Sequence, residues 1–161
     1  MRIGVVSDTH NRLINVARLV ELLNQAGVAA VFHTGDITQP ATLEVLARLD
    51  APLVGVFGNN DAGERHGLEA AAGRFGMRLL DAPHSLALAE RRIVVVHDPR
   101  ALDGALAGHD LALHGHTHRY AHERRDGCLV FNPGECAGHV AGLNAVGVVD
   151  LVTLSTELLR F

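Results

Sequence analysis

The sequence contains no lysine, only two cysteines and no apolar run near the ~20 residues that a membrane-spanning helix needs. We therefore expect no association with the interior of a membrane. Its 14 basic residues are all arginine, and because 18 residues are acidic the net charge is −4. Domains that bind a nucleic-acid backbone usually carry an excess of positive charge. Nucleic acid is thus not the expected partner.

The beginning of the chain and its cysteines indicate the compartment. Residues 1–6 start a strand-like apolar segment, with no basic leader or small-residue cleavage site, which predicts a cytoplasmic protein. Cys128 and Cys136 lack a Cys-x-x-Cys spacing and are expected to be structural thiols in that compartment. A length of 161 residues predicts a single domain over residues 1–161. Histidine, by contrast, is abundant, with eleven residues that need a chemical explanation.

The hydrophobic pattern predicts an α/β protein. In the first half, apolar β-type runs at 3–7, 30–34 and 53–57 alternate with helical periodicity at 13–26, 40–49 and 64–75. Such alternation indicates parallel strands joined by helices. The second half predicts short strands at 85–88, 93–97, 111–114, 121–125, 129–132, 145–150 and 155–161. We expect two mixed β-sheets packed as a sandwich with helices on the outer faces.

Polar clusters follow five of the predicted strands. They are Asp8-Thr9-His10, Gly35-Asp36, Gly58-Asn59-Asn60-Asp61, His97-Asp98 and Gly115-His116-Thr117-His118. Ligands bind at the carboxyl ends of strands in open α/β sheets. Residues two apart in an extended segment point to the same side, so Asp8 with His10, and His116 with His118, should face one site. Imidazole, carboxylate and amide donors together favour transition metals such as Mn²⁺, Fe²⁺, Ni²⁺, Co²⁺ or Zn²⁺.

Taken in order, the five clusters resemble the motifs of the calcineurin-like metallophosphoesterases, in their small single-domain bacterial and archaeal branch. The resemblance covers essentially the whole chain and implies a four-layer αββα fold. It implies that a metal-bridging hydroxide attacks phosphorus in a small or nucleotide-like phosphate ester, most directly a phosphodiester. It also implies two divalent ions, with Mn²⁺ or Ni²⁺ favoured: Asp8, His10 and His118 hold one, Asn59, His97 and His116 hold the other, and Asp36 bridges both.

One departure from that family concerns the leaving group. Many relatives have a histidine after the metal-binding asparagine, whereas this chain has Asn60. An amide can donate a hydrogen bond to the substrate but cannot act as an acid. His66 or His139 could supply the acid instead. Asp61 is expected to orient a neighbour of the metal centre, and His33, inside an apolar strand, to be a buried hydrogen-bonding group.

Two further departures concern the loop at residues 132–140. The branch usually reads Asn-Pro-Gly-Ser there, whereas this chain has Glu135 in place of the serine. That carboxylate either lies near the metals, where it would tighten their binding, or points to solvent or an interface. Relatives also often carry an arginine shortly afterwards, which is missing here. Arg119 or His139 could contact the phosphate in its place.

The sequence leaves two functional hypotheses open. The first is a metal-dependent phosphodiesterase that acts on a small-molecule phosphate ester. The second is a metal-loaded scaffold protein with the same fold and little activity. The presence of Asn60 in place of the usual histidine leaves this second hypothesis open. Retention of all seven ligand positions favours the enzyme, because loss of ligands usually marks an inactive relative. Strand edges and apolar helix faces are also compatible with a homodimer.

Overall fold

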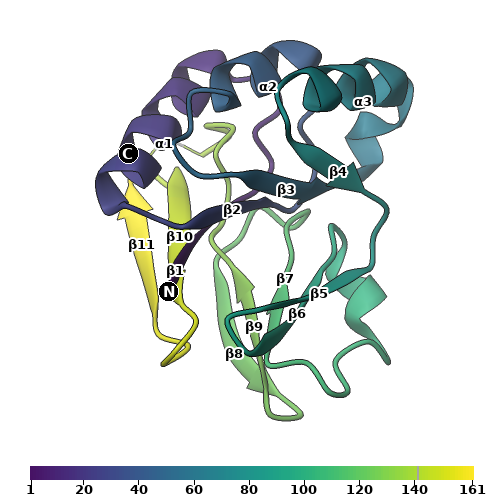
Figure 1. Cartoon of the computed structure of the whole chain (residues 1–161), viewed down its shortest axis with the longest axis vertical. Coiled ribbons are helices and arrows are strands. Elements are labelled where there is room, and N and C mark those ends of the chain that lie inside the picture. Colours follow the sequence, from purple (N-terminus) through teal and green to yellow (C-terminus); the bar gives the residue numbers. More distant parts are fainter. Residues whose placement is uncertain (141) are drawn as a thin grey trace.

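A computed structural model of the chain describes residues 1–140 and 142–161. Its first sheet has six strands in the order β11-β10-β1-β2-β3-β4 (Figure 1). β1 to β4 run parallel, while β10 and β11 are antiparallel additions beside β1. The strands of this sheet are β1 (Arg2–Val6), β2 (Ala30–His33), β3 (Leu53–Val56), β4 (Arg78–Leu80), β10 (Ala145–Asp150) and β11 (Thr156–Arg160).

The second sheet has five strands in the order β5-β6-β7-β9-β8. β6, β7 and β9 are parallel, and the edge strands β5 and β8 are antiparallel. Its strands are β5 (His84–Leu88), β6 (Arg91–Val95), β7 (Leu111–Leu113), β8 (Ala121–Arg125) and β9 (Cys128–Asn132). Both sheets are therefore mixed, and seven of their strands take part in parallel pairs: β1, β2, β3 and β4 in the first sheet and β6, β7 and β9 in the second.

Three helices cover the outer face of the first sheet (Figure 1). They are α1 (Leu13–Ala26), α2 (Pro40–Leu46) and α3 (Arg65–Arg74). Gly27 ends α1 with a left-handed φ of 62°, a conformation that glycine adopts at little steric cost. Pro40 opens α2 at a position where its missing N–H has no helical partner to lose. Their apolar stripes pack on the sheet through buried residues such as Leu19, Leu43 and Leu68.

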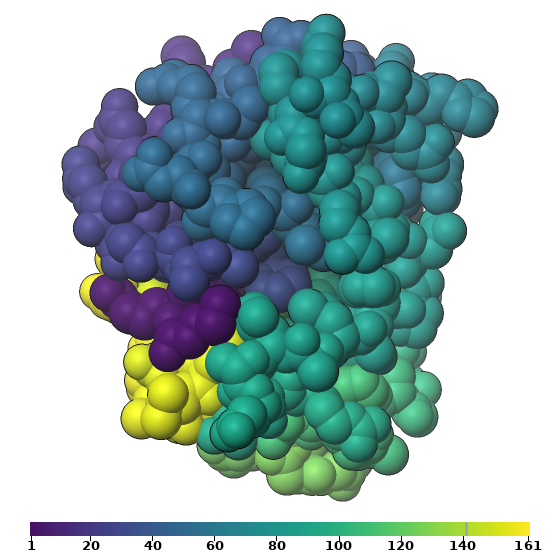
Figure 2. Space-filling model, in the orientation of Figure 1, coloured from purple at the N-terminus to yellow at the C-terminus, as the bar shows by residue number. Residues whose placement is uncertain are grey.

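A second apolar layer joins the two sheets. Phe32 of the first sheet and Phe131 of the second are buried in it, together with Ile3, Ile93 and Leu111. Figure 2 shows the first part of the chain, purple to blue, packed directly on the teal residues of the second sheet. The expected α/β arrangement of two packed mixed sheets with outer helices is confirmed.

Only a thin layer covers the outer face of the second sheet. It consists of the one-turn 3-10 helix η2 (Pro99–Leu102) and the loop after it, with Leu102 and Leu106 covering strand residues such as Val94 and Val130. Among the described residues, no helix combines the length and apolar character needed to cross a membrane. Both cysteines are buried and free, as expected of structural thiols.

The element boundaries differ from the sequence prediction in several places. The helix predicted over 40–49, for example, ends at Leu46. The segment 64–75 was expected to be one helix, but a 3-10 helix, η1 (Asn59–Glu64), precedes α3. The Asp61 carboxylate accepts the Gly58 N–H, which favours this tight turn over a regular α-helix. The short strand β4 was not predicted, because three residues of an edge strand leave no periodic pattern to detect.

Candidate metal centre

The predicted ligands come together at one edge of the two sheets. Each follows the carboxyl end of a strand: Asp8 and His10 after β1, Asp36 after β2, Asn59 after β3, His97 after β6, and His116 and His118 after β7. These strands run parallel to their neighbours, so their carboxyl ends open at a common edge. The structure thus assembles in space five motifs that span more than a hundred positions of the chain.

The first donor set consists of Asp8, His10, His118 and one oxygen of Asp36. His10 Nε2 lies 3.3 Å from His118 Nε2 and 3.5 Å from Asp36 Oδ2. Asp8 Oδ1 lies 3.5 Å from His118 Nε2 and 3.9 Å from His10 Nε2. Four donor atoms from three loops therefore face a common space, which is the geometry that a single cation requires.

The second donor set consists of Asn59, His97, His116 and the other oxygen of Asp36. Asn59 Oδ1 lies 2.9 Å from both His97 Nε2 and His116 Nδ1, and those two nitrogens are 3.2 Å apart. Asp36 Oδ1 lies 3.5 Å from His97 Nε2. Asp36 Oδ1 therefore faces this set while its Oδ2 faces the first, so one carboxylate joins the two.

Asp36 is held in this position by its neighbours. The buried Asp61 carboxylate accepts the N–H of Asp36 at 3.0 Å and that of Thr38 at 2.7 Å. Asn60 donates its backbone N–H to Asp36 Oδ1 and its side-chain amide to Oδ2. Burial alone would raise the pKa of Asp36, but the interactions with His97 and Asn60 outweigh burial and lower it below its usual range. The carboxylate is therefore ionised at neutral pH.

The backbone at the site is not extended, contrary to the reasoning from sequence. Residues two apart do face one site, but five of the predicted ligands have left-handed φ values: Asp8 (52°), His10 (44°), Asp36 (59°), His116 (64°) and His118 (55°). Residues other than glycine rarely adopt this conformation, and it gathers at functional sites. The side chains converge because each loop turns sharply, not because a strand continues through the motif.

The glycines that precede the ligands are the residues whose importance the sequence analysis missed. A Cβ on Gly58 would lie 2.2 Å from Asp36 Oδ1, and one on Gly115 would lie 2.0 Å from Ser7 Oγ and 2.8 Å from Asp8 Oδ2. Gly35 has a φ of 105°, and its Cβ would meet His97 Nδ1 at 2.7 Å. The glycine in each of the GD, GN and GH pairs leaves the space that the ligands of another loop occupy. Their recurrence directly before ligands was the available signal.

Hydrogen bonds also fix the orientation of the imidazoles. His97 Nδ1 donates to the carbonyl of Thr34 at 2.9 Å, so its Nε2 faces the second donor set. His33 is fully buried, and burial lowers its pKa to about 3, which keeps the ring neutral. Its Nδ1 accepts the Gly35 N–H, so its Nε2–H donates to Thr9 Oγ1 at 3.1 Å. His33 therefore links the loops after β1 and β2, as expected of a buried hydrogen-bonding group.

The donor atoms fit a cation chemically. Asp8 Oδ1 is buried and has no hydrogen-bond partner among the described residues, although a buried polar atom normally has one. Because the Nδ1–H of His97 is donated to the Thr34 carbonyl, its Nε2 carries a lone pair. This nitrogen lies 2.9 Å from Asn59 Oδ1, which is also an acceptor. Two acceptors at this distance need a positive charge between them. A proton can fill that role in the free protein, and a divalent ion can fill it in the loaded one.

The family model described as the calcineurin-like phosphoesterase superfamily domain matches residues 1–154. The chain belongs to this superfamily. It is similar to a phosphodiesterase of Methanocaldococcus jannaschii, with 32% identity over 155 residues that cover 93% of each chain. It is also similar to the solved structure of an archaeal phosphodiesterase, with a TM-score of 0.92, 30% identity and full coverage of both chains.

A more distant likeness concerns Vps29 of Entamoeba histolytica, solved in complex with Zn²⁺. That structure is 19% identical to this calcineurin-like phosphoesterase, with a TM-score of 0.67, and the match covers 100% of this chain and 98% of Vps29. At this level of identity the likeness shows a shared fold alone.

The predicted substrate contacts of this calcineurin-like phosphoesterase lie in different places. The Asn60 amide points to Asp36, at the centre. His139 lies beside the first donor set, 5.4 Å from the ring of His10 and 5.0 Å from that of His118. Arg119 is exposed on the loop that carries the histidine pair, and its side chain makes no ion pair with the described residues. His66, the other candidate acid, is fully exposed on α3 and lies near Glu69.

Glu135 of this calcineurin-like phosphoesterase does not point into solvent. It is 1% exposed, and its Oε2 accepts a hydrogen bond from His118 Nδ1 at 2.8 Å. Its other oxygen, Oε1, accepts the N–H of Val140 at 2.8 Å. The solvent-facing alternative is thus wrong. The carboxylate instead orients the predicted ligand His118, because its bond to Nδ1 fixes the ring so that Nε2 faces the first donor set.

We expect Glu135→Ser to weaken the binding of one ion by about 10–100-fold, because carboxylates that orient a metal-binding histidine typically contribute this much. The shorter serine cannot span the distance to His118, so that ring would lose its fixed orientation. Isothermal titration with Ni²⁺ measures the effect. The matched control is Glu123→Ser, which replaces an exposed glutamate on β8. Equal affinities in wild type and Glu135→Ser would exclude this role.

Proposed function

We propose that this chain is a binuclear metal-dependent phosphodiesterase that hydrolyses a small or nucleotide-like phosphate ester. The observation that carries the proposal is the pair of donor sets joined by Asp36, whose two oxygens each face one set. Two donor sets that share one carboxylate match the two-ion sites of phosphoryl-transfer enzymes, where the ions lie ~3.5–4 Å apart. Asp8, His10, Asp36 and His118 would hold one ion, and Asp36, Asn59, His97 and His116 the other.

The comparisons support the reaction class. The phosphodiesterase of Methanocaldococcus jannaschii matches this chain over 93% of both lengths, and we extend its activity to this chain as part of the proposal. The complete donor set also argues against the alternative, a scaffold protein with little activity. Mn²⁺ or Ni²⁺ remains the favoured ion, since five of the described side chains around the centre are imidazoles that suit transition metals.

The protein residues have separate tasks in the proposed reaction. Two bound ions would supply a hydroxide nucleophile near neutral pH and neutralise the phosphate oxygens. Asp36 links the two donor sets through its two carboxylate oxygens. The Asp61 carboxylate accepts the backbone N–H of Asp36 and so fixes its position. Asn60 lies against Asp36, where its amide could donate to a phosphate oxygen or to the leaving group. Arg119 is the proposed cationic contact for the remainder of the substrate.

Metal analysis with a substrate screen tests the proposed function. Purified protein is freed of metal, reloaded with Mn²⁺ or Ni²⁺, and assayed on aryl and alkyl phosphodiesters and phosphomonoesters. We expect two ions per chain and metal-dependent hydrolysis of bis(p-nitrophenyl) phosphate. A protein that binds two ions but hydrolyses none of these esters would instead support the scaffold. A cytoplasmic location and a homodimer stay predictions from the sequence.

We expect the rate of diester hydrolysis to fall steeply as the pKa of the leaving group rises. The side chain after the metal-binding asparagine is an amide, Asn60, which cannot protonate a departing alkoxide. Activated aryl diesters should therefore be good substrates and alkyl diesters poor ones. Rates are measured across a series of substituted phenyl diesters. A flat dependence would mean that another group acts as the acid, and of the two candidates only His139 lies beside the predicted ligands.

A further inference from the structure

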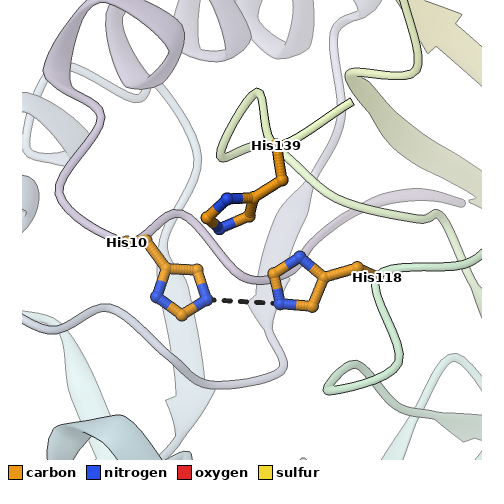
Figure 3. Close-up of side chains that lie close together, drawn as sticks. All are labelled: His10, His118 and His139. Atoms are coloured by element: carbon orange, nitrogen blue, oxygen red, sulfur yellow. Dashed lines mark hydrogen bonds between the residues drawn. The ribbon is translucent and has the colours of Figure 1, made fainter. Parts of the chain in front are cut away.

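His139 lies beside two histidines of the first donor set (Figure 3). Its ring is edge-on to His10 and tilted against His118, with centroid distances of 5.4 and 5.0 Å. One ring nitrogen from each of the three histidines lies within 4.8 Å of the other two. Figure 3 shows the three imidazoles grouped around a common space, although they come from three separate loops. Nitrogen donors at these separations can share one transition-metal ion.

Hydrogen bonds hold the loop that carries His139 against the site. Glu135 bonds His118 through one oxygen and the Val140 N–H through the other, both at 2.8 Å. One buried carboxylate thus positions a predicted ligand and the residue next to His139 together. Arg12 Nε donates to the carbonyl of Ala137 at 3.0 Å, which ties the same loop to the segment after His10. Such anchoring reduces the entropy that His139 would lose on binding an ion.

We propose that His139 is a further ligand of the ion at the first donor set. The proposal rests on the proposed two-ion centre and adds a residue to it. Among the described residues His139 makes no hydrogen bond to another side chain or to the backbone, so its ring nitrogens are available. The first ion then has five protein donors and the second has four. The phosphate accordingly binds mainly at the second ion, and His139 does not contact it directly.

Isothermal titration of the metal-free protein with Ni²⁺ tests this assignment. Wild type, His139→Ala and the control His66→Ala are compared, since His66 is fully exposed on α3 beside Glu69, which is not a predicted ligand. We expect His139→Ala to weaken the tighter ion by at least about tenfold, which is ~1.4 kcal/mol, and to leave the weaker ion unchanged. Two ions with unchanged affinity in His139→Ala would overturn the assignment and leave the proposed function standing. A wild type that binds no ion would overturn both.

Histidine modification provides a measurement that needs no variant. Diethyl pyrocarbonate is added to the metal-free and the Ni²⁺-loaded wild type, and the modified peptides are quantified by mass spectrometry. We expect Ni²⁺ alone to protect His139 together with His118, while the exposed His66 reacts equally in both states. Protection of His118 without protection of His139 would overturn the assignment. So would protection of His139 that appears only when inorganic phosphate is added, because that result would make it a phosphate contact.

Discussion

Asp36→Asn should reduce metal-dependent diester hydrolysis by at least about 10³-fold, equivalent to ~4 kcal/mol of transition-state stabilisation. Asp36 is one of only two carboxylates among the seven predicted ligands, and it is the one whose oxygens face both donor sets. The amide has nearly the same shape but no charge. Its NH₂ group would also face either the side-chain NH₂ or the backbone N–H of Asn60, and both of these are donors. One substitution therefore weakens both ions.

The measurement for Asp36→Asn combines metal stoichiometry with the rate of bis(p-nitrophenyl) phosphate hydrolysis. We expect fewer than two ions per chain at Ni²⁺ concentrations that saturate wild type. Asp50→Asn is the matched control, because Asp50 is exposed and lies outside the centre. A variant that keeps two tightly bound ions and near-normal activity would show that Asp36 does not bridge the ions. Loss of both ions with an unchanged unfolding temperature of the metal-free protein would show that the effect is local.

Gly115→Ala is expected to disrupt the centre although it removes no ligand. The added Cβ would lie 2.0 Å from Ser7 Oγ, 2.7 Å from Thr34 Oγ1 and 2.8 Å from Asp8 Oδ2. These atoms are buried, and Ser7 Oγ already donates to Asp8 Oδ2, so they cannot move aside freely. The bond from the His116 N–H to Asp8 Oδ2, 3.0 Å long, would have to lengthen. Overpacking of this kind typically destabilises a protein by about 1–3 kcal/mol.

Urea unfolding and Ni²⁺ titration together measure the effect of Gly115→Ala. We expect a lower free energy of unfolding and weaker binding of the first ion, because Asp8 belongs to the first donor set. Gly73→Ala is the matched control, since a Cβ there meets nothing within 4 Å and the residue lies in the last turn of α3. At that position the change should stabilise the protein by at most about 1 kcal/mol. Wild-type stability and metal affinity in Gly115→Ala would show that the loop can relax and that the close approach is dispensable.

The sequence predicted the sheet-and-helix order because the apolar periodicity of α1, β2 and β3 is strong. The sequence did not predict the strand β4 or the 3-10 helix η1. β4 has only three residues, and the start of η1 depends on the hydrogen bond that the Asp61 carboxylate accepts from the Gly58 N–H; Asp61 belongs to the site itself. Local propensity cannot report a turn that is stabilised by one buried side chain. The same limit applies to the motif loops, whose left-handed φ values at residues such as Asp8 and His118 are imposed by the surrounding packing.

The sequence by itself determined which residues belong together at the centre. Their types and order, from Asp8 to His118, follow from motif spacing and from the rule that parallel strands present their carboxyl ends at one edge. Only the tertiary structure decided how the members act. It assigned one Asp36 oxygen to each donor set, turned Glu135 toward His118 and placed His139 beside His10. The physical reason is that these relations depend on distances between loops of different strands, which sheet register and packing set and residue spacing does not encode.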